Sequence, residues 1–213
     1  MRLAAESLRL CLVTDRDLSR GRPTLDIVGA AVRGGATMVQ LREKNATTRA
    51  FLEEARALKE FLAPFGVPLA INDRLDIALA VGADILHVGQ SDMHVDDVRR
   101  IAGDRLAVGL SITCEADMLR ADARAADYLG VGPVYAQQTK PDATPPLGIE
   151  GFRALMQHAT KPVVAIGGLN AGNSAPVLAA GAAGLAVVSA IVAADDVEKA
   201  AMELADLWLA DRR

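Results

Sequence analysis

Residues 162–194 read PVVAIGGLNAGNSAPVLAAGAAGLAVVSAIVAA and carry no formal charge. Two apolar runs, 163–166 and 185–188, flank a segment that contains Asn170, Asn173, Ser174, Pro176 and several glycines. Most of the apolar residues are alanine, so the stretch does not supply the ~20 strongly apolar residues that a membrane helix needs. It predicts two buried strands and one closely packed helix between them, as in a parallel sheet.

The same alternation extends outward through the whole chain. Eight apolar runs have the length of buried strands, at 8–13, 38–41, 69–71, 85–88, 107–110, 128–131, 163–166 and 185–188. Helical patterns lie between and after them, at 24–33, 49–62, 74–81, 95–101, 115–125, 149–157, 173–179 and 197–209. This order predicts an α/β protein, a single (β/α)₈ TIM barrel that forms one domain over residues 1–213.

A doubly wound open sheet is the structural alternative. That fold would place a glycine-rich loop after the first strand. The first strand ends in Thr14-Asp15-Arg16, with no GxGxxG pattern, so the barrel is preferred.

Helix boundaries are marked by capping residues. Thr47, Asp73 and Asp195 stand where N-caps are expected. Glycines follow the ends of several helices, at Gly34-Gly35, Gly66, Gly82, Gly103 and Gly181.

Composition narrows the classes of partner and the compartment. A formal net charge of -4 and a pI near 5.4 argue against nucleic acid and against an anionic membrane. Cys11 and Cys114 lack CxxC spacing, and residues 1–15 lack the apolar core of a signal peptide, so we expect free thiols and a cytoplasmic location. The oligomeric state stays open, and a homo-oligomer is one alternative.

Acidic and amide side chains follow two neighbouring predicted strands. Asn72 and Asp73 come directly after the run 69–71, and Asp92 follows the run 85–88. Carboxyl ends of parallel strands meet at one edge, and Mg²⁺ is commonly held by one or two carboxylates plus substrate phosphate oxygens. These residues predict a Mg²⁺ site. The alternative is helix capping, by Asn72 or Asp73 near Arg74 and by Asp92 near Val95.

Basic side chains follow the run 38–41. Strand alternation turns Gln40, Arg42 and Lys44 to one side, and Leu41 and Glu43 to the other. Beside a Mg²⁺ site, the three donors predict binding of a polyphosphate. The alternative is a solvated loop with one Arg/Glu pair.

The last three strands lead into loops suited to a second anion. A long loop follows Gly130 and ends at Thr139-Lys140, where it is either a lid or a loop tip. Gly167-Gly168 and Ser189 follow strands seven and eight, the usual phosphate site of barrels of this kind, although a glycine pair is also typical of a plain tight turn.

The sequence offers no nucleophile that stands out. His87, inside a strand, is interpreted as a core residue, and His94 and His158 are given no role. No Ser/His/Asp or Cys/His set is recognised.

In order along the chain, these motifs resemble the thiamine phosphate synthase family. The motifs are VQLREK at 39–44, NDR at 72–74, GQSD at 89–92, GLS at 109–111, GVGP at 130–133 with Thr139-Lys140, IGG at 166–168 and VSA at 188–190. The resemblance covers nearly the whole chain. It implies a TIM barrel that joins 4-amino-2-methyl-5-hydroxymethylpyrimidine diphosphate to a thiazole phosphate, carboxylated or not, and releases pyrophosphate.

The resemblance also assigns roles to residues. It implies that the pyrimidine diphosphate is held by Gln40, Arg42, Lys44, Asn72, Ser111 and Lys140, and the Mg²⁺ by Asp73 and Asp92. It implies a thiazole phosphate pocket formed by Gln137, Gln138, Thr139, Gly168, Val188 and Ser189. Arg42, Lys44, Lys140 and Ser111 would act in catalysis. At Gln137 the chain departs from the threonine common in the family.

Two other functions remain open at this point. One is a thiazole tautomerase-like isomerase, whose relatives tend to lose the Asn-Asp pair that this chain keeps at 72–73. The other is a non-catalytic barrel that only binds a phosphorylated ligand.

Overall fold

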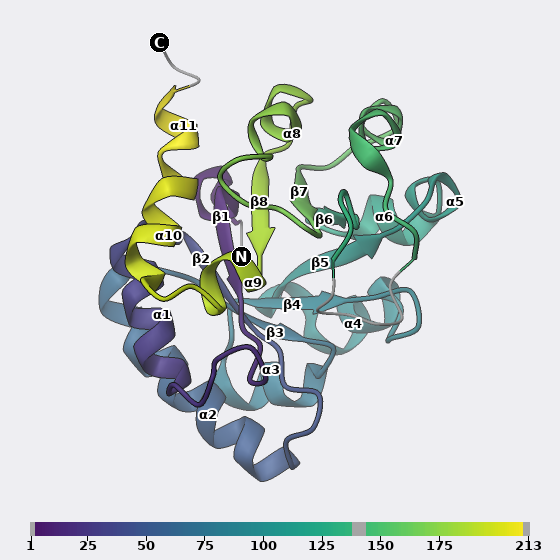
Figure 1. The fold of residues 1–213 in the computed structure, drawn as a ribbon. Helices are drawn as coiled ribbons and strands as arrows, with labels where there is room; N and C mark the ends of the chain where they lie inside the picture. Colours follow the sequence, from purple (N-terminus) through teal and green to yellow (C-terminus); the bar gives the residue numbers. More distant parts are fainter. Residues whose placement is uncertain (1–2, 138–143, 211–213) are drawn as a thin grey trace.

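A closed barrel of eight parallel strands forms the centre of the molecule (Figure 1). The computed structural model describes residues 3–137 and 144–210. Neighbouring strands pair in sequence order, and β8 closes the barrel onto β1. The strands are β1 Leu10–Val13, β2 Met38–Leu41, β3 Leu69–Asn72, β4 Ile85–Val88, β5 Ala107–Ile112, β6 Tyr128–Val131, β7 Val163–Ile166 and β8 Gly184–Val187. The predicted (β/α)₈ barrel is confirmed.

Helices surround the barrel on its outside (Figure 1). The α-helices are α1 Thr24–Arg33, α2 Thr48–Leu62, α3 Leu75–Val81, α4 Val95–Ala102, α5 Glu115–Met118, α6 Ala121–Ala125, α7 Gly148–Met156, α8 Ala175–Ala179, α9 Ser189–Val192, α10 Val197–Ala205 and α11 Leu207–Ala210. Short 3₁₀ turns add η1 Ala5–Leu8, η2 Ala63–Phe65 and η3 Gly103–Arg105. Most predicted boundaries agree within two residues.

The differences lie at breaks and caps. The helix predicted over 115–125 is two helices, because the backbone at Arg120 is extended, with φ −68° and ψ 158°. The segment predicted as one helix over 197–209 is likewise divided into α10 and α11. The short α9, directly after β8, was not predicted. Its four residues are too few to show a helical period.

Of the three predicted N-caps, one is confirmed. Thr47 caps α2 by accepting a hydrogen bond from Ala50 N. The predictions for Asp73 and Asp195 are wrong. The cap position of α3 is Arg74, and α10 is capped by Asp196, one residue further on, which accepts from Lys199 N. Asp195 and Asp196 are adjacent acids, so the sequence alone does not decide which of the two carboxylates caps the helix.

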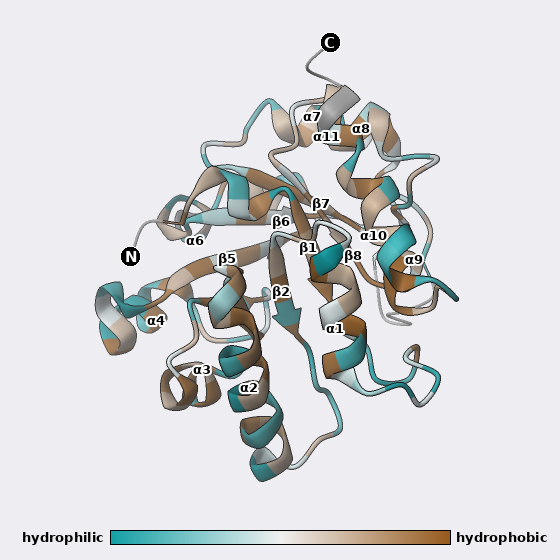
Figure 2. Ribbon diagram, turned by 90° about the vertical axis from the view of Figure 1, so that its left-hand side faces the viewer, coloured by the Kyte–Doolittle hydropathy of each residue, from teal (hydrophilic) through white to brown (hydrophobic). Residues whose placement is uncertain are grey.

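Two apolar layers hold the barrel together. The outer layer lies between the strands and the amphipathic helices, whose apolar faces turn inward (Figure 2). The inner layer fills the barrel itself with apolar side chains, including Cys11, Met38, Ala70, Ile85 and Ala107. Both faces of each strand are therefore buried, which explains why the strands are continuous apolar runs in the sequence.

The inner layer sets the direction of the polar side chains above it. Successive side chains of a strand alternate between its faces, so residues two positions after an inner residue also point inward. Gln40 follows Met38 in this way, Asn72 follows Ala70, and His87 follows Ile85. The pleat thus turns a polar layer into the barrel toward the carboxyl ends of β2, β3 and β4.

Gly109, on β5, leaves the room that this polar layer needs. A Cβ at Gly109 would lie 2.2 Å from Tyr128 Cζ and 2.5 Å from His87 Nδ1. Gly109→Ala is expected to destabilise the fold by about 1–3 kcal/mol, because both rings are buried and the added methyl group would overpack the barrel interior. Urea unfolding measures the loss. The control is Gly151→Ala in α7, whose new Cβ would lie 3.3 Å from its nearest neighbour. Equal stability of the two variants would contradict the prediction.

Candidate active site

The carboxyl ends of the strands gather most of the polar side chains singled out in the sequence. Gln40 is buried at the end of β2, and Asn72 is half-buried at the end of β3. Asn72 stands beside His87 in the register of β3 and β4, and Ser111 stands beside Gly130 in that of β5 and β6. Four neighbouring strands therefore contribute to one polar rim, as the sequence predicted.

A cavity of about 580 Å³ opens beside this rim, after β1 and β2. Asp15 and Arg42 both line it and contact each other, with 3.4 Å between Asp15 Oδ2 and Arg42 Nη1. The other oxygen, Asp15 Oδ1, accepts from Leu18 N at 3.1 Å, and Arg42 N donates to Thr14 Oγ1 at 3.0 Å. Arg42 is thus anchored at both its backbone and its guanidinium, with the two side chains of the pair only 16% and 12% exposed.

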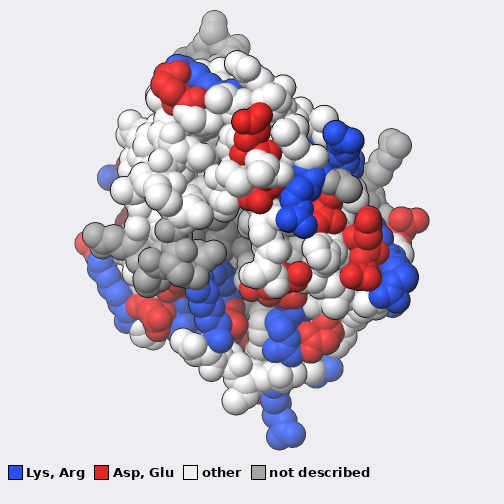
Figure 3. Space-filling model, turned by 90° about the vertical axis from the view of Figure 1, so that its right-hand side faces the viewer, with Lys and Arg blue, Asp and Glu red and all other residues white. Residues whose placement is uncertain are grey.

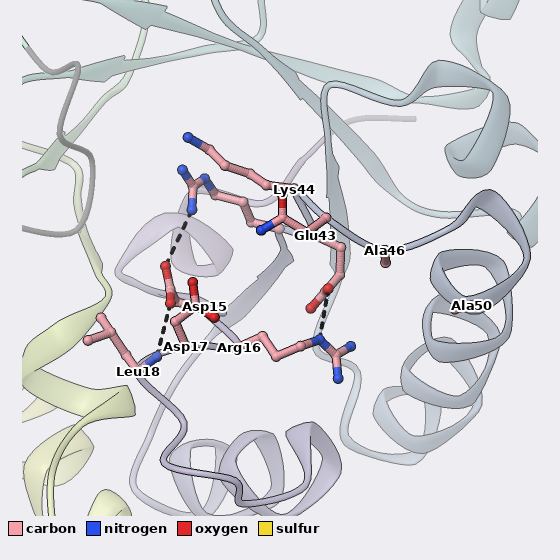
Figure 4. A pocket seen from close by; sticks show the side chains of 10 residues that line it. Asp15, Arg16, Asp17, Leu18, Glu43, Lys44, Ala46 and Ala50 are labelled. Atoms are coloured by element: carbon pink, nitrogen blue, oxygen red, sulfur yellow. Dashed lines mark hydrogen bonds and ion pairs between the residues drawn. The ribbon is translucent and has the colours of Figure 1, made fainter.

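A second ion pair lines the same cavity. Arg16 contacts Glu43 at 3.0 Å (Figure 4). It also contacts Glu54 at 2.7 Å. Lys44 extends away from this pair. The predicted alternation is confirmed, because Glu43 turns from Arg42 and Lys44 toward Arg16. Glu43 therefore does not neutralise Arg42, as a simple Arg/Glu loop would require.

Asp15 is the site residue that the sequence did not single out. Its position could have indicated this role, since it lies two residues after the first strand, where a barrel carries its functional groups. The triplet at 14–16 served only to exclude a nucleotide-binding loop.

The acidic residues do not occupy the N-cap positions of α3 and α4. Neither α3 nor α4 has a side-chain hydrogen bond at its N-cap, and the cap positions are Arg74 and His94. Asp92 instead closes the turn after β4, where its Oδ2 accepts from Gly89 N at 2.7 Å. Asp73 adopts a left-handed backbone, with φ 63°, and its N–H donates to His87 O at 2.8 Å. A left-handed backbone is uncommon outside glycine, and such positions are often found at functional sites.

The donor set suits a hard cation that shares its ligands with a substrate. Asp73 and Asp92 follow adjacent strands, β3 and β4, and the half-buried Asn72 amide precedes them. Within 3–137 and 144–210, no three His, Cys, Asp or Glu side chains form a metal-binding group. Two carboxylates are enough for Mg²⁺ when phosphate oxygens and water complete its shell.

A row of hydrogen bonds crosses the barrel interior. His87 Nδ1 lies 2.9 Å from Tyr128 Oη, and His87 Nε2 lies 2.9 Å from Ser111 Oγ. Burial lowers the pKa of His87 to about 4, against a smaller opposite effect of the Asp92 carboxylate. His87 is a hydrogen-bonded core residue, as predicted. The sequence did not predict its contact with Ser111, since the two are 24 residues apart.

The glycine turn after β7 is packed against the loop after β6. A Cβ at Gly167 would lie 2.5 Å from Pro133 Cα, and one at Gly168 would lie 2.5 Å from Ala136 O. Both glycines also have positive φ, 99° and 66°. Only glycine lets these two loops approach so closely, so the pair is more than an ordinary tight turn.

The other residues predicted for this side that the structure describes follow β6 and β8. Val188 is half-buried and Ser189 exposed, at the start of α9 after β8. Gln137 is half-buried and ends the described part of the loop. Gln138, Thr139 and Lys140 lie outside the described residues.

The surface charge and the helix lengths bear on two possible partners, nucleic acid and membrane. Acidic and basic side chains are interspersed on the face drawn in Figure 3, without a broad basic area. Within the described ranges, no helix is both long and apolar enough to pass through a bilayer. Cys11 is buried and Cys114 exposed, and both are free thiols.

Comparison with known proteins gives one consistent family. Residues 10–191 match the family model of thiamine monophosphate synthase. Thiamine-phosphate synthase of Chloroflexus aurantiacus is 54% identical over 196 residues, which are 92% of this chain and 90% of that protein. The enzyme of Albidiferax ferrireducens is 52% identical, over 95% of this chain and 92% of that protein.

Solved structures agree. Thiamine phosphate pyrophosphorylase from Pyrococcus furiosus superimposes with a TM-score of 0.86 at 37% identity, over 95% of this chain and 96% of that one. A 3-hexulose-6-phosphate synthase reaches 0.71 at 19% identity, which reflects the shared barrel alone.

Proposed function

This chain belongs to the thiamine monophosphate synthase family, and we propose that it joins 4-amino-2-methyl-5-hydroxymethylpyrimidine diphosphate to a thiazole phosphate in a Mg²⁺-dependent reaction that releases pyrophosphate. Membership makes it a transferase of thiamine biosynthesis. The observation that carries the proposal is the joint position of an anion-binding group and an acidic group at one rim. Arg42 and Lys44 follow β2, while Asp73 and Asp92 follow β3 and β4.

The diphosphate is assigned to the β2 side of this rim. Arg42 is oriented by Asp15 and can offer its remaining guanidinium donors to phosphate oxygens, with Lys44 as a second positive charge. Gln40 and Asn72 point inward beside them and provide neutral amide donors. Ser111 completes the set from β5, and Lys140 is the basic residue proposed to arrive from the loop after β6.

Asp73 and Asp92 would hold the Mg²⁺, and the cation would supply positive charge that stabilises the departing pyrophosphate. Negative charge grows on that leaving group as the bond to the pyrimidine methylene carbon breaks. Arg42, Lys44 and Lys140 stabilise it electrostatically. The electron-rich aminopyrimidine shares the positive charge left behind, and the thiazole nitrogen then captures the carbon.

This route needs no protein nucleophile. Burial raises the pKa of the Cys11 thiol to about 12, so the thiol stays protonated inside the barrel. The two ring nitrogens of His87 contact the hydroxyl groups of Tyr128 and Ser111, and within the described chain neither nitrogen is hydrogen-bonded to a carboxylate. The protein contributes charge and position instead of a covalent intermediate.

The thiazole phosphate is assigned to the opposite side of the rim. Gly168, Val188 and Ser189 follow β7 and β8, where the start of α9 offers backbone N–H groups to an anion. Gln137, Gln138 and Thr139 are proposed to contact the thiazole from the loop after β6.

We also propose that the protein is located in the cytoplasm and that residues 1–213 form a single domain.

A coupled assay tests the reaction directly. Purified protein is mixed with both substrates and Mg²⁺, thiamine phosphate is detected as fluorescent thiochrome after oxidation, and pyrophosphate is measured in parallel. The proposal requires both products in equal amounts, and neither when one substrate is omitted. Thermal stabilisation by the ligands without turnover would indicate a non-catalytic barrel. Rearrangement of the thiazole phosphate without the pyrimidine would indicate a tautomerase.

Asp15→Asn tests how Arg42 is held. The amide oxygen of asparagine can still accept from Leu18 N, but the variant lacks the charge that faces the guanidinium. We expect kcat/KM for the pyrimidine diphosphate to fall about three- to tenfold, because Arg42 loses its fixed orientation. Steady-state kinetics measures this. A rise in kcat/KM would show that the carboxylate mainly repels the diphosphate, and would contradict the positioning role.

A further inference from the structure

We propose that Tyr128 is a positioning residue that, acting through His87, fixes Ser111 as a hydrogen-bond donor toward the diphosphate. The inference rests on the proposed function, since the diphosphate is taken as the group that Ser111 meets. Its starting point is the row Tyr128 Oη, His87 Nδ1, His87 Nε2, Ser111 Oγ, with 2.9 Å at each of its two contacts. The row runs from the closed barrel interior to the rim.

The direction of the first hydrogen bond follows from burial. Tyr128 is only 1% exposed, and burial raises the pKa of its phenol well above the usual range, so the hydroxyl keeps its proton. Within the described chain, His87 Nδ1 is the only hydrogen-bond partner of Tyr128 Oη. A buried O–H without an acceptor would bear the full cost of its desolvation. The phenol therefore donates to Nδ1.

The direction of the second hydrogen bond follows from the first. A neutral imidazole has one donor nitrogen and one acceptor nitrogen, and Nδ1 is already the acceptor. The ring is neutral because it is buried, with a hydroxyl on each nitrogen. Nε2 therefore carries the proton and donates it to Ser111 Oγ.

The polarity at Ser111 is the functional consequence. A hydroxyl that accepts from His87 keeps its own proton for a third group, and unprotonated diphosphate oxygens only accept. The opposite direction would turn a lone pair of Ser111 toward an anion. Gln90 supports the arrangement, because its Nε2 donates to Ser111 O at 2.7 Å and holds the backbone.

The same polarity separates this row from a catalytic triad. In a triad, a carboxylate accepts from Nδ1–H, which leaves Nε2 free to take the serine proton. Here a phenol donates to Nδ1, so Nε2 is already protonated and cannot activate Ser111. His87 serves to orient the serine, not to make it a nucleophile.

The backbone around the row is shaped to admit it. A Cβ at Gly109 would collide with both rings, as described above, and a Cβ at Gly130 would lie 2.9 Å from His87 Cε1. Two adjacent strands thus carry glycine where any side chain would collide with the rings. Both rings are buried, with His87 8% and Tyr128 1% exposed, and these glycines leave the room that the rings occupy.

Nitrogen NMR reads the tautomer without substrate. In protein labelled with ¹⁵N in histidine, the ring shifts distinguish protonated from bare nitrogens, and the His94→Gln and His158→Gln variants assign the His87 signals. The wild type is expected to show His87 protonated at Nε2 and bare at Nδ1. Tyr128→Phe should shift the population toward protonation at Nδ1. Protonation of Nδ1 in the wild type would overturn the proposal, even if the enzyme is fully active.

A double-mutant cycle then tests the path of action. Tyr128→Phe should lower kcat about tenfold in the wild-type background, and leave kcat unchanged in a Ser111→Ala background, because the residue to be oriented is then absent. A merely structural Tyr128 would cost the same factor in both backgrounds, which would refute the positioning role. Should Tyr128→Phe not fold, the wild-type spectrum still decides the tautomer. A wild type with the expected tautomer but no thiamine phosphate production would refute the proposed function alone.

Discussion

Asp92→Asn is expected to raise the Mg²⁺ concentration for half-maximal activity by about tenfold or more. The amide oxygen of asparagine can still accept from Gly89 N, so the turn after β4 keeps its hydrogen bond. What the variant removes is one of the two carboxylate charges proposed to hold the cation. Activity at saturating Mg²⁺ should recover in large part, because Asp73 and the diphosphate remain as ligands.

The measurement is a titration of activity against Mg²⁺, with Mn²⁺ binding followed independently by electron paramagnetic resonance. Asp104→Asn is the matched control, since it removes the same charge from η3, which leads into the amino end of β5. An unchanged Mg²⁺ requirement in Asp92→Asn would assign the carboxylate to the Gly89 turn alone. The wild type should lose activity in EDTA and regain it with added Mg²⁺.

The strands could be predicted from the sequence because burial on both faces makes each of them a short apolar run. Four of the eight predicted ranges coincide with those observed, β2, β4, β6 and β7. The longer helices were predicted for a similar reason, since α1 and α2 repeat their apolar positions with the helical period. The short helix α9 and the break between α10 and α11 were not predicted, because four residues and a single break carry no local period.

The rim was predictable because parallel strands place their carboxyl ends together. Gln40, Asn72 and Ser111 could therefore be predicted to lie at one rim from their place near the carboxyl ends of the strands. The pairings within the rim could not be predicted. Arg42 and Asp15 are 27 residues apart, and His87 and Tyr128 are 41 apart. Such contacts depend on strand register and on the glycines that admit the rings, and no local pattern records either.

Arg42→Ala is expected to lower kcat by about 10²-fold, more than it raises KM for the pyrimidine diphosphate. The reason is that charge accumulates on the diphosphate as its bond to carbon breaks, so a fixed guanidinium gains more interaction in the transition state than in the bound substrate. Its salt-bridge partner, Asp15, would also remain half-buried without this cation, next to an anionic substrate. Both effects act against the departure of pyrophosphate.

Two further variants separate position from charge. Arg16→Ala removes the same charge from the same cavity, but Arg16 is 59% exposed and engaged by Glu43 and Glu54, so its loss should change kcat by less than about threefold. Arg42→Lys keeps the charge but not the planar fork, and should fall between the two. Steady-state kinetics for both substrates provides the comparison. A rise in KM alone for Arg42→Ala would make Arg42 a uniform binder, and equal losses for Arg16→Ala and Arg42→Ala would reduce its role to general attraction of an anion.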